Sequence, residues 1–213
     1  QKDNLSQLAA ASFGQTFTVT PLQLITAVSA CVNGGNLMQP HMVKQITDSE
    51  GNVTRVEPTV VRQVISEDTS AMVRKMLEQV VSDPVEGTGK NAYVAGYRIG
   101  GKTGTSEKVA QLAAGGPNEY IVSFIGVAPM DKPQIAVLVL LDTPSNETGI
   151  YISGGRMGAP TVGKMMADIL PYMGIEAQYT EEELKVQYNT VNYLVGYSVE
   201  DATAHIASRF VKY

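Results

Sequence analysis

The amino-acid sequence predicts an α+β fold, in which helices pack on an antiparallel sheet. Three extended segments rich in apolar and β-branched residues lie at roughly 96–106, 120–128 and 134–142. The turn between the last two, APMDKP, is too short for a parallel crossover, so these two strands must be antiparallel neighbours. Helix-start signals elsewhere in the chain, followed by apolar residues on one helical face, supply the layers that cover the sheet.

Each predicted helix has a recognisable beginning. The stretch TPLQ from Thr20 combines a capping threonine, a first-turn proline and a glutamine three residues on, and its helix should end near Asn33. Ser66 opens a second helix, which the dipeptide DP at 83–84 ends. Pro160 starts a third. The residues expected on one buried face of the second and third helices are Val73, Met76, Leu77, Val80 and Val81, and Val162, Met165, Met166, Ile169 and Leu170.

Smaller elements complete the predicted organisation. VKQIT and VTRVE should form a hairpin around a turn at 48–52. Residues 175–185 are acidic and are predicted to form a linker between a domain at 1–174 and a tail at 186–213. The tail holds a strand-like VNYLV and a helix start at Ser198, too few residues to fold alone.

Composition and charge narrow the class of protein. The chain has 213 residues, of which 44% are hydrophobic and 17% charged, as expected for a packed core. Its net charge of −5 argues against general nucleic-acid binding, which needs a basic face. The single cysteine, Cys31, excludes an intrachain disulfide and is expected to be a buried structural thiol. The most apolar run, IAVLVLL, is far too short to span a bilayer.

The stretch GYRIGGKTGTSEK, residues 96–108, fits two functional motifs. Its first part matches the phosphate-binding loop G-x-x-x-x-G-K-[ST], and the strand IAVLVLLD could supply a magnesium-binding carboxylate at Asp142. Such a loop needs a helix beginning at the lysine, whereas Gly104 and β-branched residues follow Lys102. The second motif is K-T-G, which lies on a strand bordering the cleft of serine acyl-transfer enzymes. Gly104 and the β-branched residues after Lys102 favour a strand over a helix, and therefore favour the K-T-G interpretation.

On a strand, Lys102 and Gly104 would share one face, and Thr103 and Thr105 the other. A lysine beside a serine can shift local proton affinities, while hydroxyl and backbone N–H groups can hold a substrate carboxylate. Gly104 would let a substrate lie against the backbone. Taken alone, however, three residues fit an exposed surface strand better than a catalytic site.

Longer segments match a known family. They are ASFGQTFTVTPLQLITAVSACVNGG, GGNLMQPHMV, GTGKNAYVAGYRIGGKTGTSEK, SFIGVAP and GAPTVGKMMADIL, in this order over most of residues 10–172. In them the chain resembles the C-terminal half of the transpeptidase domain of class B penicillin-binding proteins, which implies the α+β fold of these proteins and of serine β-lactamases. The tail segment VNYLVGYSVEDA resembles the start of a PASTA module.

The resemblance implies acyl transfer without a cofactor or metal. In this family a serine attacks the D-Ala-D-Ala end of a peptidoglycan stem peptide, a second stem resolves the acyl-enzyme into a cross-link, and β-lactams acylate the same serine. By resemblance Lys102 is catalytic, and Thr103, Gly104 and Thr105 bind the carboxylate of substrate or β-lactam. The backbone N–H of Thr105 would be one oxyanion donor.

Two further family motifs are missing. The family needs S-x-x-K, which holds the nucleophile and general base, and S-x-N. No serine in this chain has lysine three residues on or asparagine two residues on. In the family both motifs precede K-T-G, so this chain alone is expected to lack a nucleophile and to be inactive, and the missing N-terminal half of the domain is an expected partner.

The other expected partners are peptidoglycan stem peptides, β-lactam antibiotics and wall-synthesis proteins of cell division or sporulation. The intact protein is expected on the extracytoplasmic face of a bacterial membrane, held by an anchor outside this chain. Two alternatives stay open: a non-catalytic cell-wall-binding fragment, and a carboxypeptidase, β-lactamase or β-lactam sensor of the same superfamily. The isolated His41 and His205 do not suggest a metal site. Arg156 is expected to be solvated, and the loop after Lys108 either borders the cleft or is a surface connection.

Overall fold

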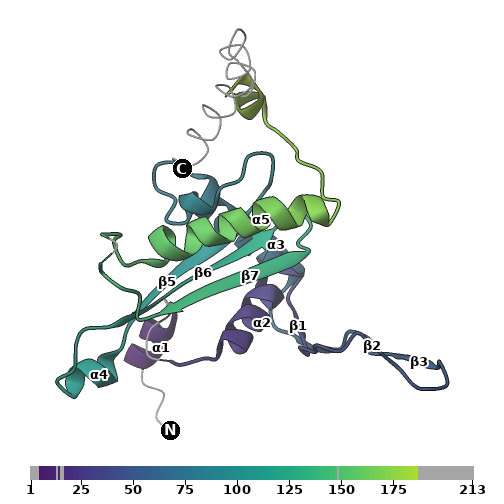
Figure 1. Ribbon diagram of the computed structural model, residues 1–213, viewed down its shortest axis with the longest axis horizontal. Helices are drawn as coiled ribbons and strands as arrows, with labels where there is room; N and C mark the ends of the chain where they lie inside the picture. Colours follow the sequence, from purple (N-terminus) through teal and green to yellow (C-terminus); the bar gives the residue numbers. More distant parts are fainter. Residues whose placement is uncertain (1–4, 13, 15–16, 148, 187–213) are drawn as a thin grey trace.

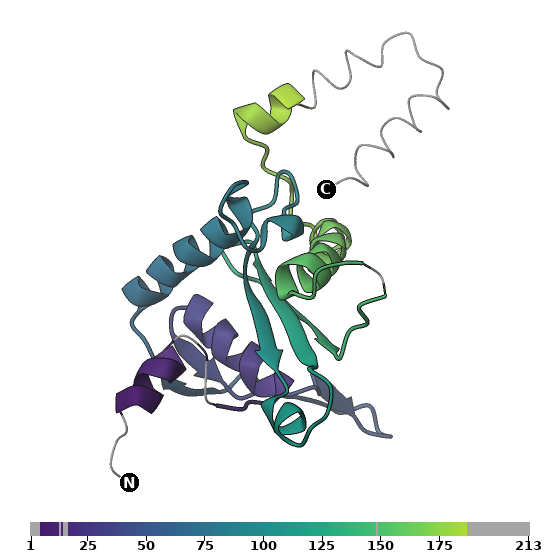
Figure 2. The ribbon, with the colours of Figure 1, turned by 90° about the vertical axis from the view of Figure 1, so that its left-hand side faces the viewer.

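The computed structural model describes residues 5–12, 14, 17–147 and 149–186. Its centre is an antiparallel sheet with the strand order β5-β6-β7. Figure 2 shows the sheet nearly edge-on, with α5 on one side and α2 and α3 on the other. The predicted α+β architecture is therefore confirmed. The elements that build it are α2 (Pro21–Val32), α3 (Glu67–Ser82), β5 (Gly100–Glu107), β6 (Tyr120–Ala128), β7 (Ile135–Asp142) and α5 (Ala159–Tyr172).

The core lies on both faces of β6, because alternate residues of this strand point to opposite sides. Phe124 is fully buried and packs with Val162 and Met166 of α5. Val127 points the other way and packs with Val32 of α2 and with Met130, which follows β6. The central strand thus joins the two helical layers.

The predicted helix starts are confirmed in detail. Thr20 Oγ1 accepts a hydrogen bond from the Gln23 backbone N–H at 3.2 Å, and the Gln23 side chain accepts one from the Thr20 N–H at 2.9 Å. Ser66 caps α3 by accepting from the Thr69 N–H. Gly34 and Gly35 follow α2 with φ of +88° and +90°, which favour glycine and end the helix.

The buried faces of α3 and α5 are narrower than predicted. Met76 is 58% exposed and Met165 39% exposed, so the prediction that they share the buried faces is wrong. On α5 the buried positions follow an i, i+3, i+4 pattern: Ala159, Val162, Gly163, Met166 and Leu170. Met165 lies one residue, or about 100°, to the side of that stripe. Cys31 is likewise half-buried rather than buried, and burial raises the pKa of its thiol.

The chain between α2 and α3 forms two small two-stranded ribbons. The predicted hairpin is confirmed as β2 (Gln45–Thr47) paired with β3 (Val53–Arg55), and all its strand residues are exposed. Its turn is organised by Asp48, whose Oδ1 accepts from the N–H groups of Glu50 and Asn52 at 2.9 Å each. The hairpin projects from the body (Figure 1). Closer to the body, β1 (Asn36–Met38) pairs with β4 (Val60–Gln63).

A buried serine joins α2 to α3. Ser70 is fully buried; its Oγ donates to the carbonyl of Cys31 at 2.8 Å and accepts from the N–H of Gly34 at 3.0 Å. Arg74, one turn further along α3, donates to the carbonyl of Val32 at 3.0 Å. These bonds satisfy backbone groups that the end of α2 leaves unpaired.

Substituting Ser70 with alanine is expected to lower the free energy of unfolding by about 1–3 kcal/mol, because a buried carbonyl and N–H would lose their partner. Urea denaturation followed by circular dichroism measures this change. Ser82→Ala, at an exposed position of the same helix, is the matched control and should change stability by less than about 0.5 kcal/mol. Equal stability of the two variants would contradict the assigned role.

Beyond α5 the described chain continues to residue 186. The predicted division at 174/175 and 185/186 stays a prediction. The PASTA-like segment, including Ser198 and His205, lies outside the described residues except for its first residue. Among the described helices, none has both the length and the hydropathy to cross a membrane.

Candidate active site

The K-T-G motif lies in the middle of β5. Lys102 is paired in register with Ile125 of β6, and Gly104 with Ser123. The strand continues through Glu107, so no helix begins at the lysine and the phosphate-loop interpretation is wrong. The strand itself begins at Gly100 rather than at residue 96.

Asp142, the other residue of the nucleotide interpretation, is engaged in an ion pair. Its Oδ1 lies 2.5 Å from Nζ of Lys108, which also contacts Glu119 at 3.4 Å. Hydrogen bonds from Lys108 and Thr143 lower the pKa of Asp142, and the bond with Asp142 raises the pKa of Lys108. These contacts join the ends of β5, β6 and β7. The loop with the short helix α4 (Val109–Ala113) starts here, and its place beside a cleft stays a prediction.

β5 is one of the two edge strands of the three-stranded sheet. β6 pairs with one side of it, and no strand within the described residues pairs with the other. An edge strand presents unpaired N–H and C=O groups, to which an extended peptide can bind in the manner of an added strand. The K-T-G interpretation requires such unpaired backbone groups on the strand that carries the motif.

Side chains of the motif alternate between the two faces, as predicted. Thr103 and Thr105 point toward the α5 side, where the short helical segment η2 (Gly154–Gly158) packs against β5 and β6. The Gly154 N–H donates to Thr105 Oγ1 at 3.4 Å. Lys102 points to the opposite face with Gly104.

Lys102 has a charge that is open to an anion. Its side chain is exposed, and Nζ donates to the carbonyl of Thr103 at 2.9 Å. In the part of the chain that the structure describes, the ion pairs involve Arg98 and Lys108 but not Lys102. An ammonium group without a carboxylate partner can bind a substrate anion without first breaking an internal bond.

Glycines allow the backbone to pack closely around the motif. A Cβ on Gly104 would lie 2.5 Å from Ser123 Oγ, and one on Gly154 would lie 2.0 Å from the carbonyl oxygen of Ser123. A Cβ on Gly155 would lie 2.3 Å from the carbonyl oxygen of Thr88. No side chain fits against the two carbonyl oxygens at Gly154 and Gly155, whereas the Ser123 hydroxyl beside Gly104 ends a side chain that can rotate. Arg156 in η2 is exposed, as predicted, but nothing in the sequence indicates that Gly154 contacts the motif.

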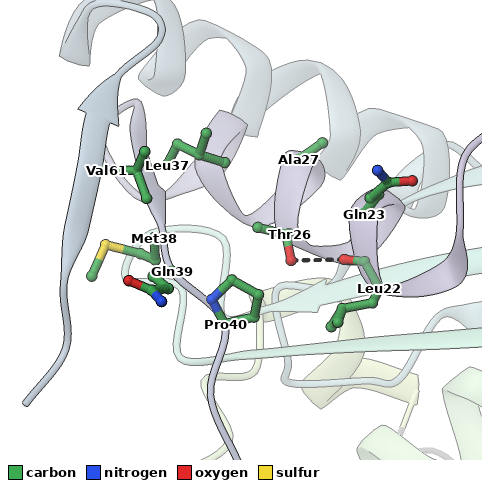
Figure 3. Close-up of a pocket in the computed structure, with 9 residues that line it drawn as sticks. All are labelled: Leu22, Gln23, Thr26, Ala27, Leu37, Met38, Gln39, Pro40 and Val61. Atoms are coloured by element: carbon green, nitrogen blue, oxygen red, sulfur yellow. Dashed lines mark hydrogen bonds between the residues drawn. The ribbon is translucent and has the colours of Figure 1, made fainter. Parts of the chain in front are cut away.

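An apolar groove of about 310 Å³ lies elsewhere, between α2 and the β1–β4 ribbon (Figure 3). Its lining includes Leu22, Leu37, Pro40 and Val61, and no residue of β5. The hydroxyl of Thr26 donates to the carbonyl of Leu22 at 2.7 Å, so the groove offers few free polar groups. It is separate from the K-T-G strand. Among the described residues, no three His, Cys, Asp or Glu side chains gather as a metal site.

Solved structures with the same arrangement place the fold among penicillin-binding transpeptidase domains. The apo transpeptidase domain of Burkholderia pseudomallei penicillin-binding protein 3 matches with a TM-score of 0.64 and 32% identity, over 84% of this chain and 50% of that one. Penicillin-binding protein 3 of Mycobacterium tuberculosis, complexed with ampicillin, matches with a TM-score of 0.69 and 28% identity, over 83% of this chain and 40% of that one.

Sequence comparisons identify the family. The family model of the penicillin binding protein transpeptidase domain matches residues 1–167. Stage V sporulation protein D of Bacillus subtilis is 44% identical over 200 residues, and peptidoglycan D,D-transpeptidase FtsI of Escherichia coli K12 is 35% identical over 184 residues. The matches cover 91% and 83% of this chain, which spans 30% and 28% of the length of those relatives. The chain belongs to the transpeptidase-domain family of class B penicillin-binding proteins.

Proposed function

We propose that this chain forms one wall of the active-site cleft of a peptidoglycan D,D-transpeptidase that β-lactams also acylate. The observation that supports this most directly is Lys102, exposed and without an ion pair among the described residues, on an edge strand of a domain of this family. The names of the relatives favour a transpeptidase over a carboxypeptidase, β-lactamase or β-lactam sensor.

Each motif residue has a role in this proposal. Lys102 supplies positive charge that organises proton transfer and attracts the anionic substrate. Thr103 and Thr105 donate hydrogen bonds to the substrate carboxylate, and Gly104 lets the acyl group lie against the strand. The backbone N–H of Thr105 stabilises the oxyanion of the tetrahedral intermediate.

The nucleophile of the proposed reaction comes from outside this sequence. No serine here belongs to S-x-x-K or S-x-N, so those motifs are assigned to the remainder of the transpeptidase domain. The proposal also places the intact protein at the extracytoplasmic face of a bacterial membrane, with stem peptides as substrates and a PASTA-like segment after residue 185.

A fluorescent penicillin tests the proposed division of roles. We expect no covalent label on this chain alone, because it supplies no nucleophile. Folding it together with a segment that contains S-x-x-K and S-x-N should yield label on the serine of that segment, detected on a denaturing gel and located by mass spectrometry. The control is the same segment with that serine replaced by alanine, which should remain unlabelled.

Two results would contradict the proposal. Covalent labelling of this chain alone would show that it holds its own nucleophile. Absence of labelling in a co-folded sample, whose native fold is confirmed by circular dichroism, would show that the K-T-G strand does not complete a penicillin-reactive site.

A further inference from the structure

The chain after α5 returns to the body of the domain. The Gln178 N–H donates to the carbonyl of Gly96 at 2.7 Å, and the hydroxyl of Tyr97 donates to the carbonyl of Ile175 at 3.3 Å. Ile175 also packs against the buried cluster under α5. The acidic composition of this segment predicts a linker, and the structure adds that its backbone is bonded to residues about 80 positions earlier.

Glu183 is the most heavily bonded residue of this segment. Its Oε1 accepts from the Gly96 N–H at 3.0 Å and from the hydroxyl of Tyr93. Its Oε2 accepts from the Thr180 N–H at 2.6 Å, while its own N–H donates to Thr180 Oγ1 at 3.2 Å. Both carboxylate oxygens therefore accept hydrogen bonds. Oε2 caps the start of the helical turn at 181–186, and Oε1 binds the body of the domain.

The electrostatics agree with a charged carboxylate at this position. Burial by itself would raise the pKa of Glu183, but the hydrogen bonds from Tyr93, Thr180 and Gly96 lower it on balance. Burial and the bond to Glu183 raise the pKa of Tyr93, so its hydroxyl stays a donor. A negative charge that accepts three hydrogen bonds is held more firmly than an exposed surface carboxylate.

The segment packs closely against a glycine in the turn at 93–97. Gly96 has a φ of +79°, and a Cβ there would lie 2.8 Å from the Cβ of Ala177 and 2.9 Å from Cε1 of Tyr179. Any side chain at Gly96 would push the segment away. Gly96 therefore helps to hold the segment in two ways: it leaves space for Ala177 and Tyr179, and its N–H donates to the carboxylate of Glu183.

This turn leads directly into the K-T-G strand. Between Gly96 and the start of β5 lies Arg98, whose guanidinium makes two hydrogen bonds of 2.7 Å to the carboxylate of Glu78 in α3. The carbonyl of Arg98 accepts from the Met130 N–H at 2.9 Å. The entry to β5 is consequently held by α3, by the end of β6 and by the returning C-terminal segment.

We propose that residues 175–183 form a strap docked on the turn at 93–97, with Glu183 as its anchor. The strap fixes the direction in which the chain leaves the domain, and it steadies the turn that leads into β5. This device is independent of the acyl-transfer chemistry proposed above.

Hydrogen exchange measured by mass spectrometry on the full chain tests the strap. Glu183→Gln keeps the size of the side chain but removes the charge and places an amide NH₂ in the site. We expect hydrogen exchange in peptides covering 93–97 and 175–183 to become about 10-fold faster, because the variant loses a charge-assisted hydrogen bond. Glu182→Gln, an exposed neighbour with the same change in charge, is the matched control and should exchange like the unmodified chain.

A second variant and a second measurement make the test decisive. Tyr93→Phe removes the other partner of Glu183 and should accelerate exchange in the same two regions. Spin labels at positions 164 and 185, in a chain with Cys31 replaced by alanine, should give a narrow distance distribution that broadens with Glu183→Gln. Equal behaviour of Glu183→Gln and Glu182→Gln, or equally faster exchange throughout β6, would overturn the proposal.

Discussion

Replacing Lys102 with alanine is expected to slow acylation by a β-lactam about 10²- to 10⁴-fold, the range in which a positioned acid–base group contributes to catalysis. The same change should leave the free energy of unfolding within about 0.5 kcal/mol of the unmodified protein. The reason is that Lys102 is exposed and, within the described part of the chain, bonds only to the carbonyl of Thr103, so its removal opens no core.

The measurement is the second-order rate of labelling by a fluorescent penicillin in the complete transpeptidase domain, together with a urea denaturation curve. Lys132→Ala is a suitable control, since Lys132 is also exposed but lies in the turn between β6 and β7. Arginine at position 102 should restore only part of the rate, because its planar guanidinium replaces a compact ammonium. A Lys102→Ala variant that is acylated at the normal rate would remove this residue from the mechanism.

Replacing Gly154 with alanine is expected to harm both stability and acylation. The new Cβ would lie 2.0 Å from the carbonyl oxygen of Ser123 and 2.8 Å from that of Gly104, both backbone atoms that cannot rotate aside. We expect the free energy of unfolding to fall by about 1–3 kcal/mol, as for other overpacked sites. Because η2 must move off β5, the hydrogen bond to Thr105 Oγ1 is lost, and acylation should slow at least about tenfold.

Gly51→Ala separates the clash from the general cost of removing a glycine. Gly51 has a φ of +86° in the turn of the β2–β3 hairpin, and a Cβ there meets nothing within 4 Å. This control should cost about 1–2 kcal/mol for the left-handed backbone, with no change in acylation rate. If Gly154→Ala is acylated as fast as the unmodified domain, then η2 does not position Thr105.

Helix starts and strand pairing could be predicted because their signals are local. The capping box at Thr20 and the cap at Ser66 depend on residues three positions apart, and the turn before β7 excludes a parallel pair by its length alone. The position of K-T-G on a strand follows in the same way from Gly104 and its neighbours.

Contacts between distant residues could not be predicted from such signals. Gly154 packs on Gly104 and Ser123, and only the packing of η2 on the sheet reveals why it is glycine. Glu183 bonds to Tyr93 and Gly96, which are 90 and 87 residues away in the chain. In the sequence these positions appear as a glycine-rich loop and an acidic run, which are typical of many unrelated surfaces.

Helical periodicity also has limited resolution. It correctly predicted which side of α5 is buried, but not how wide the buried stripe is. Met76 and Met165 follow the apolar pattern and yet are 58% and 39% exposed, because one helical position corresponds to about 100° of rotation. The sequence pattern describes hydrophobicity, whereas burial depends on how far the neighbouring elements extend.

The close packing of backbone on backbone beside β5 has a consequence for the evolution of antibiotic resistance. A side chain at Gly154 or Gly155 would collide with the backbone carbonyl of Ser123 or of Thr88, so selection has little freedom at these positions. Lys102 and Thr105 have room for other side chains, but the proposed chemistry needs both. In a transpeptidase built in this way, changes that weaken β-lactam binding and preserve wall synthesis should accumulate around this strand, and seldom within it.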